Sequence, residues 1–223
     1  MTEGLRQHHK ISREKAYERA IDMLNVVGIP NPEERMKQHP HQFSGGMRQR
    51  IVIAIALICE PELLIADEPT TALDVTIQAQ ILELFDEIQK KLNVAIVLIT
   101  HDLGVVAKIA DRIAVMYAGK IIETGLKHDI FYNSQHPYTK GLLNSIPRLD
   151  MKGKELEPIA GTPPDLFSPP KGCPFMARCP LAMGVCNKIY PETTSLTDLH
   201  RVDCWLQDDR AKEQKALLHA EKI

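Results

Sequence analysis

Apolar side chains recur at helical spacing in several segments of the chain. Residues 13–27 place them three or four positions apart, and a glycine and a proline follow to end the predicted helix. A second helix is predicted over 44–59 and a short one over 103–110. The longest begins after Asp74, a favourable N-cap, and carries an apolar face made of Ile77, Ile81, Leu84, Ile88 and Leu92.

Short apolar runs between these helices predict strands. Residues 63–66 and 94–100 flank the helix that follows Asp74. Strands that alternate with helices form parallel sheets covered on their faces, so both strands are expected to be buried. Residues 112–117 and 120–124 predict two further strands around a tight turn. The whole pattern is that of an α/β protein.

The character of the chain changes at about residue 150. Regular periodicity fades there, and proline, glycine and cysteine become frequent. We therefore expect one domain over residues 1–150 and a small Cys-rich C-terminal extension over residues 151–223.

Composition narrows the class of protein. The 223 residues are 44% hydrophobic and 25% charged, as in ordinary soluble globular proteins. A net charge of -2 argues against binding of nucleic acid, which normally requires a basic excess. The longest apolar run, 51–59, is far shorter than the ~20 residues of a membrane-spanning helix, and the polar segment 2–10 contains no secretory signal. We expect a cytosolic protein whose membrane contacts run through partners.

Three polar side chains directly follow the two predicted parallel strands. Asp67 and Glu68 end the first strand, and His101 ends the second. Open α/β sheets bind ligands at this edge. There Asp67 can hold Mg²⁺, Glu68 can polarise a water for attack on a γ-phosphate, and His101 can contact that phosphate or the water. Taken singly, the two acids also fit an ordinary strand exit, and one histidine is usually incidental.

The second predicted helix opens with Ser44, Gly45 and Gly46. Two glycines let the backbone approach a ligand closely, and the free N–H groups of a helix N-terminus attract an anion. A serine N-cap followed by a tight turn is the simpler interpretation of these three residues alone.

The five cysteines fall into two groups. Cys59 ends an apolar helix and fits a small core residue, whereas four others gather near the C-terminus: Cys173, Cys179, Cys186 and Cys204. In a reducing cytosol such a group indicates a metal or iron–sulfur site more than disulfides. The gaps of five, six and seventeen residues suit a zinc site poorly, because its cysteines usually stand two to four apart. An iron–sulfur cluster, zinc and no metal remain the three alternatives.

Four segments in order resemble the motifs of the ABC-transporter ATPase family. These are FSGGMRQR at 43–50, LIADEPT at 64–70, ALD at 72–74 and THD at 100–102, which correspond to the signature, Walker B, D-loop and switch histidine. The resemblance implies a P-loop NTPase domain with a parallel sheet and a helical subdomain. Met47 departs from the glutamine that is commoner in the signature.

The family resemblance also implies roles for these residues. Its ATPases pair head to tail and bind ATP with Mg²⁺, so Ser44, Gly45, Gly46 and Met47 would contact a nucleotide held by a second ATPase subunit. Asp67 would hold Mg²⁺, Asp74 would lie near the nucleotide, and Glu68 and His101 would be catalytic on the subunit's own ATP.

One expected motif is absent from the sequence. No G-x-x-x-x-G-K-[ST] phosphate loop occurs in the 223 residues. We therefore expect a truncated or split product whose own ATP site is incomplete.

The C-terminal part of the chain resembles the C-terminal extension of oligopeptide and dipeptide importer ATPases. The segments that carry this resemblance are HPYTKGLL at 136–143, EPIAGTPP at 157–164 and CPFMARCP at 173–180. It implies a peripheral protein on the cytoplasmic face of the membrane, with two transmembrane permease subunits and, indirectly, a peptide-binding protein as partners. Some importers of this kind carry a [4Fe–4S] cluster at these cysteines.

Other functions fit parts of the same pattern. DNA-repair and chromosome ATPases share the signature and Walker B, but they carry coiled coils or basic surfaces that this sequence lacks. A catalytically dead fragment or an iron–sulfur-bearing module that pairs with an intact ATPase is a second alternative. The cargo stays open between dipeptides, longer peptides and nickel complexes.

Overall fold

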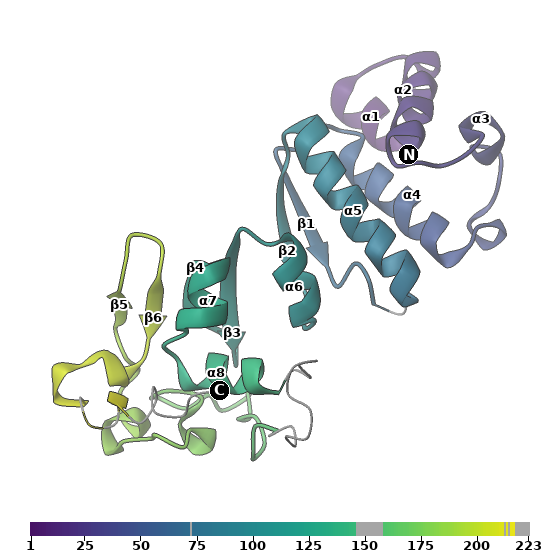
Figure 1. Ribbon diagram of the computed structural model, residues 1–223. Coiled ribbons are helices and arrows are strands. Elements are labelled where there is room, and N and C mark those ends of the chain that lie inside the picture. The colour runs from purple at the N-terminus through teal and green to yellow at the C-terminus, as the bar shows by residue number, and fades with distance from the viewer. Residues whose placement is uncertain (72, 146–157, 212, 214, 217–223) are drawn as a thin grey trace. The chain divides into compact units, whose positions relative to one another are not determined.

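The computed structural model describes residues 1–71, 73–145, 158–211, 213, 215 and 216. Its contacts divide the chain into two compact units, Met1–Val105 and Val106–Ile223, called unit 1 and unit 2 below. The domain boundary that the composition predicts near residue 150 lies outside the described residues. Figure 1 labels the helices and strands of both units.

Unit 1 begins with a small helical cluster. Helix α1 (Thr2–His9) packs on α2 (Arg13–Val26), and the two bury Leu5, Ala16 and Ala20 completely. The periodicity predicts α2 correctly, but it does not reveal α1 because Leu5 is its only buried side chain. Two short turns of helix follow, α3 (Pro32–Arg35) and η1 (Pro40–Gln42).

The rest of unit 1 combines two helices with a pair of parallel strands. Helix α4 spans Gly45–Leu57 and ends two residues earlier than the pattern predicts, and α5 spans Val75–Leu92. Strand β1 (Leu63–Asp67) pairs in parallel with β2 (Ala95–Ile99), and α5 connects them. Figure 1 shows α5 running alongside these strands.

The expectation that both strands are buried is wrong for one face of this sheet. Leu64 and Ala66 of β1 are buried, whereas the alternate side chains are about half exposed: Leu63 50%, Ile65 63%, Val97 46% and Ile99 48%. Paired residues of parallel strands project to the same side, and β1 pairs Ile65 with Val97. One face is therefore covered, whereas the side chains of the other face are about half exposed in the described part of the chain.

Unit 2 is built on a four-stranded antiparallel sheet in the order β3-β4-β6-β5. Strands β3 (Arg112–Tyr117) and β4 (Lys120–Leu126) form the predicted hairpin, and its turn residues Ala118 and Gly119 both have positive φ, 48° and 77°. Strands β5 (Thr193–Ser195) and β6 (Arg201–Asp203) come from the C-terminal segment 158–216, called the tail below, where the sequence pattern predicts no strands. Three residues are too few to display an alternating pattern.

Helices and short 3₁₀ turns complete the connections. Helix α6 (Leu103–Ile109) occupies the predicted segment, and α7 (Lys127–Asn133) and α8 (Pro137–Asn144) follow the hairpin. The tail adds four turns: η2 (Met176–Arg178), η3 (Gly184–Asn187), η4 (Trp205–Gln207) and η5 (Asp209–Ala211).

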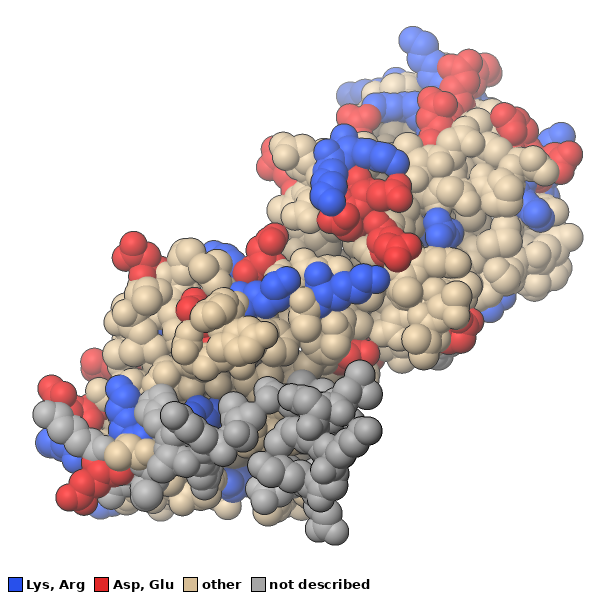
Figure 2. Space-filling model, in the orientation of Figure 1, with Lys and Arg blue, Asp and Glu red and all other residues tan. Residues whose placement is uncertain are grey.

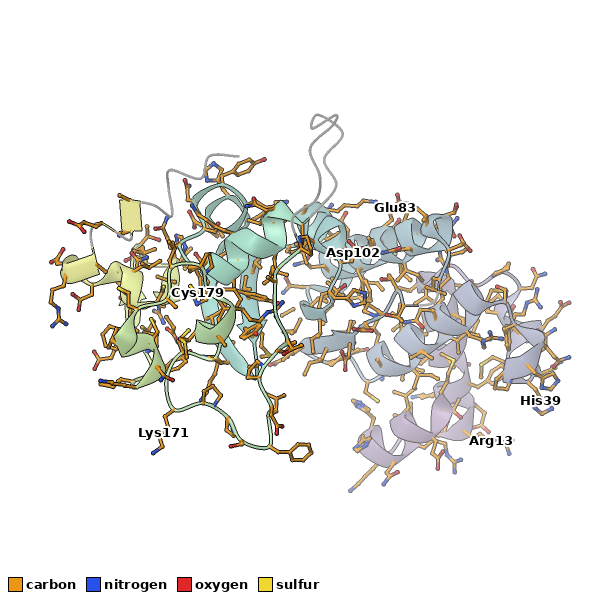
Figure 3. The ribbon with its side chains drawn as sticks, turned by 90° about the horizontal axis from the view of Figure 1, so that it is seen from below. Arg13, His39, Glu83, Asp102, Lys171 and Cys179 are labelled. Carbon is orange, nitrogen blue, oxygen red and sulfur yellow. The ribbon has the colours of Figure 1, made fainter. Side chains whose placement is uncertain are left out.

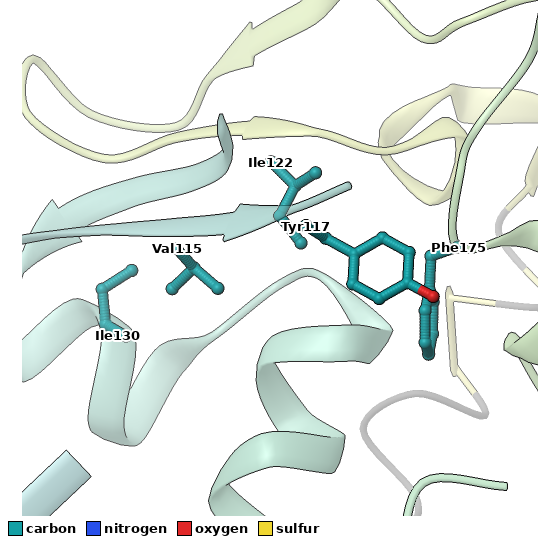
Figure 4. Packing of buried hydrophobic residues seen from close by; sticks show 5 residues of the cluster. All are labelled: Val115, Tyr117, Ile122, Ile130 and Phe175. Atoms are coloured by element: carbon teal, nitrogen blue, oxygen red, sulfur yellow. The ribbon is translucent and has the colours of Figure 1, made fainter. Parts of the chain in front are cut away.

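The core of unit 2 joins the tail to the hairpin. Phe175 packs with Val115, Tyr117, Ile122 and Ile130 in one buried cluster, which Figure 4 shows from close by. The rings of Tyr117 and Phe175 meet edge to face, with centroids 5.3 Å apart. The tail in this unit is therefore held by apolar packing as well as by pairing of β6 with β4.

Candidate functional site

The first candidate site lies where β1 and β2 end in unit 1. Asp67 is the last residue of β1 and pairs with Ile99, so the segments that leave the two strands start side by side. Glu68 turns sharply, with φ 44°, and its N–H donates to the carbonyl oxygen of Ile99 at 2.9 Å. This local geometry directs the chain after β1 toward the chain after β2.

Glu68 and His101 meet in this turn. Oε1 of Glu68 lies 3.0 Å from Nδ1 of His101, and Oε2 accepts a hydrogen bond from the Thr71 hydroxyl at 2.9 Å. The hydrogen bond with His101, and then that with Thr71, hold the pKa of Glu68 below its ordinary value. The carboxylate stays 46% exposed and the imidazole 78% exposed. An ionised, accessible carboxylate with an oriented imidazole can position and polarise a water.

The other acids near this turn have different tasks. Asp67 is exposed and, among the described residues, makes no side-chain hydrogen bond, so its oxygens are open to a cation. Asp74 is the N-cap of α5, because its Oδ1 accepts from the Ile77 N–H at 2.9 Å. Asp102, labelled in Figure 3, accepts from the Gly104 N–H at 2.8 Å and so opens α6.

The predicted Ser-Gly-Gly site forms the start of α4. The Ser44 hydroxyl oxygen accepts from the Met47 N–H at 3.3 Å, so the serine acts as an N-cap. Gly46 is packed against α5, since a Cβ there would lie 2.8 Å from Cγ2 of Ile77. Gly45 is exposed, and a Cβ there would meet nothing nearer than Leu73 at 3.8 Å. Packing in this chain thus accounts for Gly46 and leaves Gly45 unexplained.

These two groups of predicted residues are not joined within the described structure. The N-terminus of α4 contacts Leu73 and Ile77, and no hydrogen bond connects it to Glu68 or His101. The resemblance implies the same separation, because it places Ser44 and Gly45 on a nucleotide held by another subunit.

The second candidate site is a pocket in unit 2, and all four clustered cysteines line it. It encloses about 320 Å³ of space, part of it open to solvent, and its wall also includes His136, Phe175 and Trp205. Cys179 is labelled in Figure 3. Two segments that line the pocket are joined by a backbone hydrogen bond, which the Cys173 N–H donates to the carbonyl oxygen of Cys186 at 2.8 Å.

Gly172 makes this arrangement possible. A Cβ at this position would lie 2.1 Å from the carbonyl oxygen of Cys186, which is a direct clash with backbone. Only glycine lets the two segments approach closely enough for Cys173 and Cys186 to share one pocket. Sequence reasoning missed Gly172, because its requirement comes from a contact with a segment fourteen positions away.

The thiols of this pocket are held in an apolar environment. Burial raises the pKa of Cys179 to about 11 and that of Cys204 to about 12, and it raises the pKa of Cys173 as well. These thiols therefore keep their protons at neutral pH unless a cation replaces them. In the described part of the chain, no three or more His, Cys, Asp or Glu side chains lie close enough to hold a metal ion. The thiols surround the pocket instead of meeting at one point.

A buried carboxylate beside this pocket was also missed by the sequence analysis. Glu123 on β4 is 1% exposed and accepts hydrogen bonds from three donors. These are the N–H of Gln135 at 2.6 Å, the N–H of His136 at 3.1 Å and Nε2 of His200 at 2.9 Å. The only sequence signal was an acid within a predicted strand, directly after Ile121 and Ile122.

Charge and hydropathy add two observations. Basic and acidic side chains are interspersed on the face shown in Figure 2, without a large area of one sign. Among the described residues, no helix is both long enough and apolar enough to cross a membrane.

Comparisons with known proteins identify the family. Residues 2–71 match the family described as ABC transporter, and residues 122–186 match the oligopeptide/dipeptide transporter C-terminal region. The chain is 69% identical to the dipeptide transport ATP-binding protein DppD of Bacillus subtilis over 94% of its own length. It is 55% identical to the oligopeptide transport ATP-binding protein OppD of Salmonella typhimurium over 86% of its length.

Coverage and structure complete the comparison. The chain spans 63% of the length of that DppD and 57% of that OppD, less than two thirds of either. A solved chain of an inward-facing ABC transporter, described as metal-chelate type, is 26% identical with a TM-score of 0.52, covering 60% of this chain and 50% of that one. The fold is thus that of an ABC ATPase, with mixed helices and sheets. The chain belongs to the family of ATP-binding subunits of oligopeptide and dipeptide ABC transporters.

Proposed function

We propose that this chain is part of an ATPase subunit that energises peptide import. It supplies the turn with Glu68 and His101, which would act in ATP hydrolysis, and the signature segment 43–50, which would face a second ATPase subunit. The observation that carries the proposal is the contact of 3.0 Å between Glu68 and His101 at the ends of two parallel strands. Thr71 holds the second carboxylate oxygen, so Glu68 is oriented from two sides and stays ionised.

The proposed roles follow from where each side chain lies. Asp67, exposed beside this turn, binds Mg²⁺ on the nucleotide through its carboxylate. Glu68 takes the proton of the attacking water, and His101 orients Glu68 and the water. Magnesium contributes neutralisation of phosphate charge when it is bound.

The signature residues act on a different nucleotide. Gly45 is exposed and has no packing reason to be glycine, which suits close approach of a phosphate to the backbone. We place Ser44, Gly45 and Met47 against ATP held by a second ATPase subunit, with Asp74 at the same interface.

The test uses the chain fused behind a segment that supplies a G-x-x-x-x-G-K-[ST] phosphate loop. Glu68→Gln is expected to lower ATP turnover of the fused protein by ~100-fold or more, the scale of general-base loss. His101→Ala is expected to lower it strongly as well. Glu62→Gln, a change of an exposed acid before the other end of β1, is the matched control. Unchanged turnover in both site variants would remove these assignments.

The unfused 223-residue chain provides the baseline for this experiment. Loop N–H groups and the loop lysine make most phosphate contacts in such sites, so we expect weak Mg-ATP binding and background turnover. Turnover by the chain alone that Glu68→Gln abolishes would contradict this expectation.

We further propose peptides as the cargo and membrane proteins as partners. The match of residues 122–186 to the oligopeptide/dipeptide transporter C-terminal region supports both. The assembly would comprise a second ATPase subunit and two transmembrane permease subunits at the cytoplasmic face, fed by a peptide-binding protein. ATP-driven uptake of a dipeptide into vesicles that carry the fused protein and its permeases tests this. Uptake of a nickel complex without uptake of peptides would reassign the cargo.

We also propose that the four-cysteine pocket holds a metal centre in a Cys-rich extension. Its donor set fits, because four thiols line one apolar pocket, and burial raises the pKa of Cys173, Cys179 and Cys204, so that these three need a cation to lose their protons. A single zinc ion needs sulfurs at about 2.3 Å from one point, and the thiols do not converge in that way. Cysteine thiolates are the ligands that iron–sulfur clusters take, so Cys173, Cys179, Cys186 and Cys204 would hold a [4Fe–4S] cluster here.

The centre would staple the tail of unit 2. Segments as small as this tail often require a metal for stability. Anaerobic purification with iron, sulfide and zinc analysis is the test. About four irons per chain supports the cluster, stoichiometric zinc selects the alternative, and metal-free protein removes the centre from the proposal.

A further inference from the structure

His136 is completely enclosed at the junction of α7 and α8, and its side chain is only 1% exposed. It is the N-cap residue of α8, because its Nδ1 accepts a hydrogen bond from the N–H of Tyr138 at 3.0 Å. Its own backbone N–H donates to Glu123, which fixes the main chain at the same point.

The contact with Tyr138 determines where the ring carries its proton. A backbone N–H can only donate, so Nδ1 must offer its lone pair and cannot be protonated. The proton of the imidazole therefore lies on Nε2, which becomes a hydrogen-bond donor. Burial also lowers the pKa of His136 to about 3, in agreement with a neutral ring.

This donor has no acceptor among the described residues. Nε2 of His136 is one of the buried side-chain atoms without a hydrogen-bond partner. A buried donor that forms no hydrogen bond costs about 1–3 kcal/mol, so native structures rarely leave one unsatisfied. Such an atom indicates a group that is missing from the protein atoms alone.

The surroundings of His136 show what kind of acceptor would fit. The imidazole lines the same pocket as the four cysteines, together with apolar side chains such as Phe175 and Leu206. Phe175 packs on the imidazole at a centroid distance of 5.9 Å and supplies an apolar contact. The polar side-chain atoms that face the pocket from the cysteines are sulfurs, which accept hydrogen bonds well only when they are ionised or bound to a metal.

We propose that the Nε2–H of His136 donates a hydrogen bond to a sulfur of the metal centre in the four-cysteine pocket, either a ligand thiolate or a bridging sulfide. This inference rests on the proposed centre. His136 is then a positioning residue rather than a ligand, and it links the fold of α8 to the chemistry of the pocket. A hydrogen bond to a cluster sulfur stabilises the more negative oxidation state and raises the reduction potential.

Two substitutions of His136 separate its role as the N-cap of α8 from its role as a hydrogen-bond donor through Nε2. His136→Asn keeps an oxygen near the position of Nδ1, where it can accept from the Tyr138 N–H, but it has no donor at the position of Nε2. His136→Gln places an amide N–H₂ near the position of Nε2 and loses the cap. Loss of the N-cap alone would change the stability of His136→Gln, whereas loss of the hydrogen-bond donor would show its effect in His136→Asn.

The experiment compares the reconstituted 223-residue chain and both variants anaerobically. The readouts are the reduction potential, followed by the electron paramagnetic resonance signal of the reduced centre, and the rate at which a chelator removes the metal. In His136→Asn we expect the reduction potential to fall by about 59 mV, which corresponds to a tenfold shift of the one-electron equilibrium toward the oxidised state. Metal release should be faster in His136→Asn than in His136→Gln, whose potential should stay near that of the unchanged protein.

The outcomes distinguish this inference from the proposed centre. A bound centre whose potential and release rate are the same in His136→Asn as in the unchanged protein overturns the role of His136 and leaves the centre in place. If the centre is zinc, the release rates alone decide in the same way. Absence of iron and zinc from the unchanged protein overturns the centre, and the hydrogen bond with it.

Discussion

Oε1 of Glu123 on β4 lies 2.9 Å from Nε2 of His200, a residue 77 positions later in the chain. Both side chains are buried, with 1% and 4% exposure. His200 directly precedes β6, so this contact fastens the tail at the point where β6 pairs with β4. The same carboxylate accepts the N–H groups of Gln135 and His136, and therefore joins the tail, the hairpin and the start of α8.

Glu123→Gln is expected to destabilise unit 2 by roughly 3 kcal/mol. A hydrogen bond to a charged group contributes about 1.5–3 kcal/mol, and the amide would replace one acceptor by a donor that faces other donors. The single tryptophan, Trp205, lies in this unit, so its fluorescence during denaturation reports the loss. Glu192→Gln, at an exposed position of the tail, is the control. A midpoint equal to that of the control would show that Glu123 contributes little.

Gly172→Ala is expected to open the cysteine pocket. The added methyl group would lie 2.1 Å from the Cys186 carbonyl oxygen, so the backbone must separate and the bond from the Cys173 N–H must lengthen. We expect metal content after anaerobic reconstitution to fall at least severalfold. Gly184→Ala is a matched control near the same cysteine, because a Cβ there has no neighbour within 4 Å among the described residues. Full metal content in Gly172→Ala would contradict the proposed role of this close approach.

Gly46→Ala and Gly45→Ala should differ in their effects on stability and on ATP turnover. The first forces a methyl group onto Ile77 and should destabilise unit 1 by about 1–2 kcal/mol, after the gain of up to about 1 kcal/mol in helix propensity is subtracted. The second meets open space and should leave stability unchanged or slightly higher. In the fused ATPase assembled with its partner, Gly45→Ala should nevertheless reduce turnover, because the methyl group would occupy space proposed for phosphate. Denaturation curves and ATPase rates of the same samples check both parts.

The pH dependence of turnover should change in Thr71→Val. The hydroxyl of Thr71 helps to keep the pKa of Glu68 low, so its removal raises that pKa. Activity that requires the ionised carboxylate is lost as pH falls through its pKa, and the loss should therefore begin at a higher pH in the variant. A pH–rate profile of the fused protein measures this. Thr76→Val, an exposed change on α5, controls for general effects. If the acid sides of the pH–rate profiles of Thr71→Val and the unchanged fused protein coincide, the Thr71 hydroxyl does not influence the pKa of Glu68.

Local patterns were sufficient for much of unit 1 and for the β3–β4 hairpin. Asp74 and Ser44 are N-caps as their positions before apolar helices predict. The turn at Ala118 and Gly119 follows from a glycine between two apolar runs. These features depend on residues within a few positions of each other, and such short-range physics can be read from sequence.

Burial was less predictable than secondary structure. The apolar run of β1 suggested a strand covered on both faces, but Leu63 and Ile65 are exposed. An apolar run shows that a strand can be buried, whereas its actual cover depends on which other segments pack on it. Likewise α1 carries a single buried leucine, and no periodicity can reveal a helix from one anchor.

The sequence by itself determined the family and the order of its motifs, and it singled out Glu68 and His101 as candidates, because short segments of consecutive residues carry these signals. Only the tertiary structure decided that the two side chains meet at 3.0 Å, since that contact depends on the register of two parallel strands. It also decided that Gly172 must be glycine, that Glu123 is shared by three donors, and that His136 lines the cysteine pocket and carries a buried Nε2 without a hydrogen-bond partner among the described residues. Each of these joins segments far apart in the chain, and the packing that brings them together has no local signature.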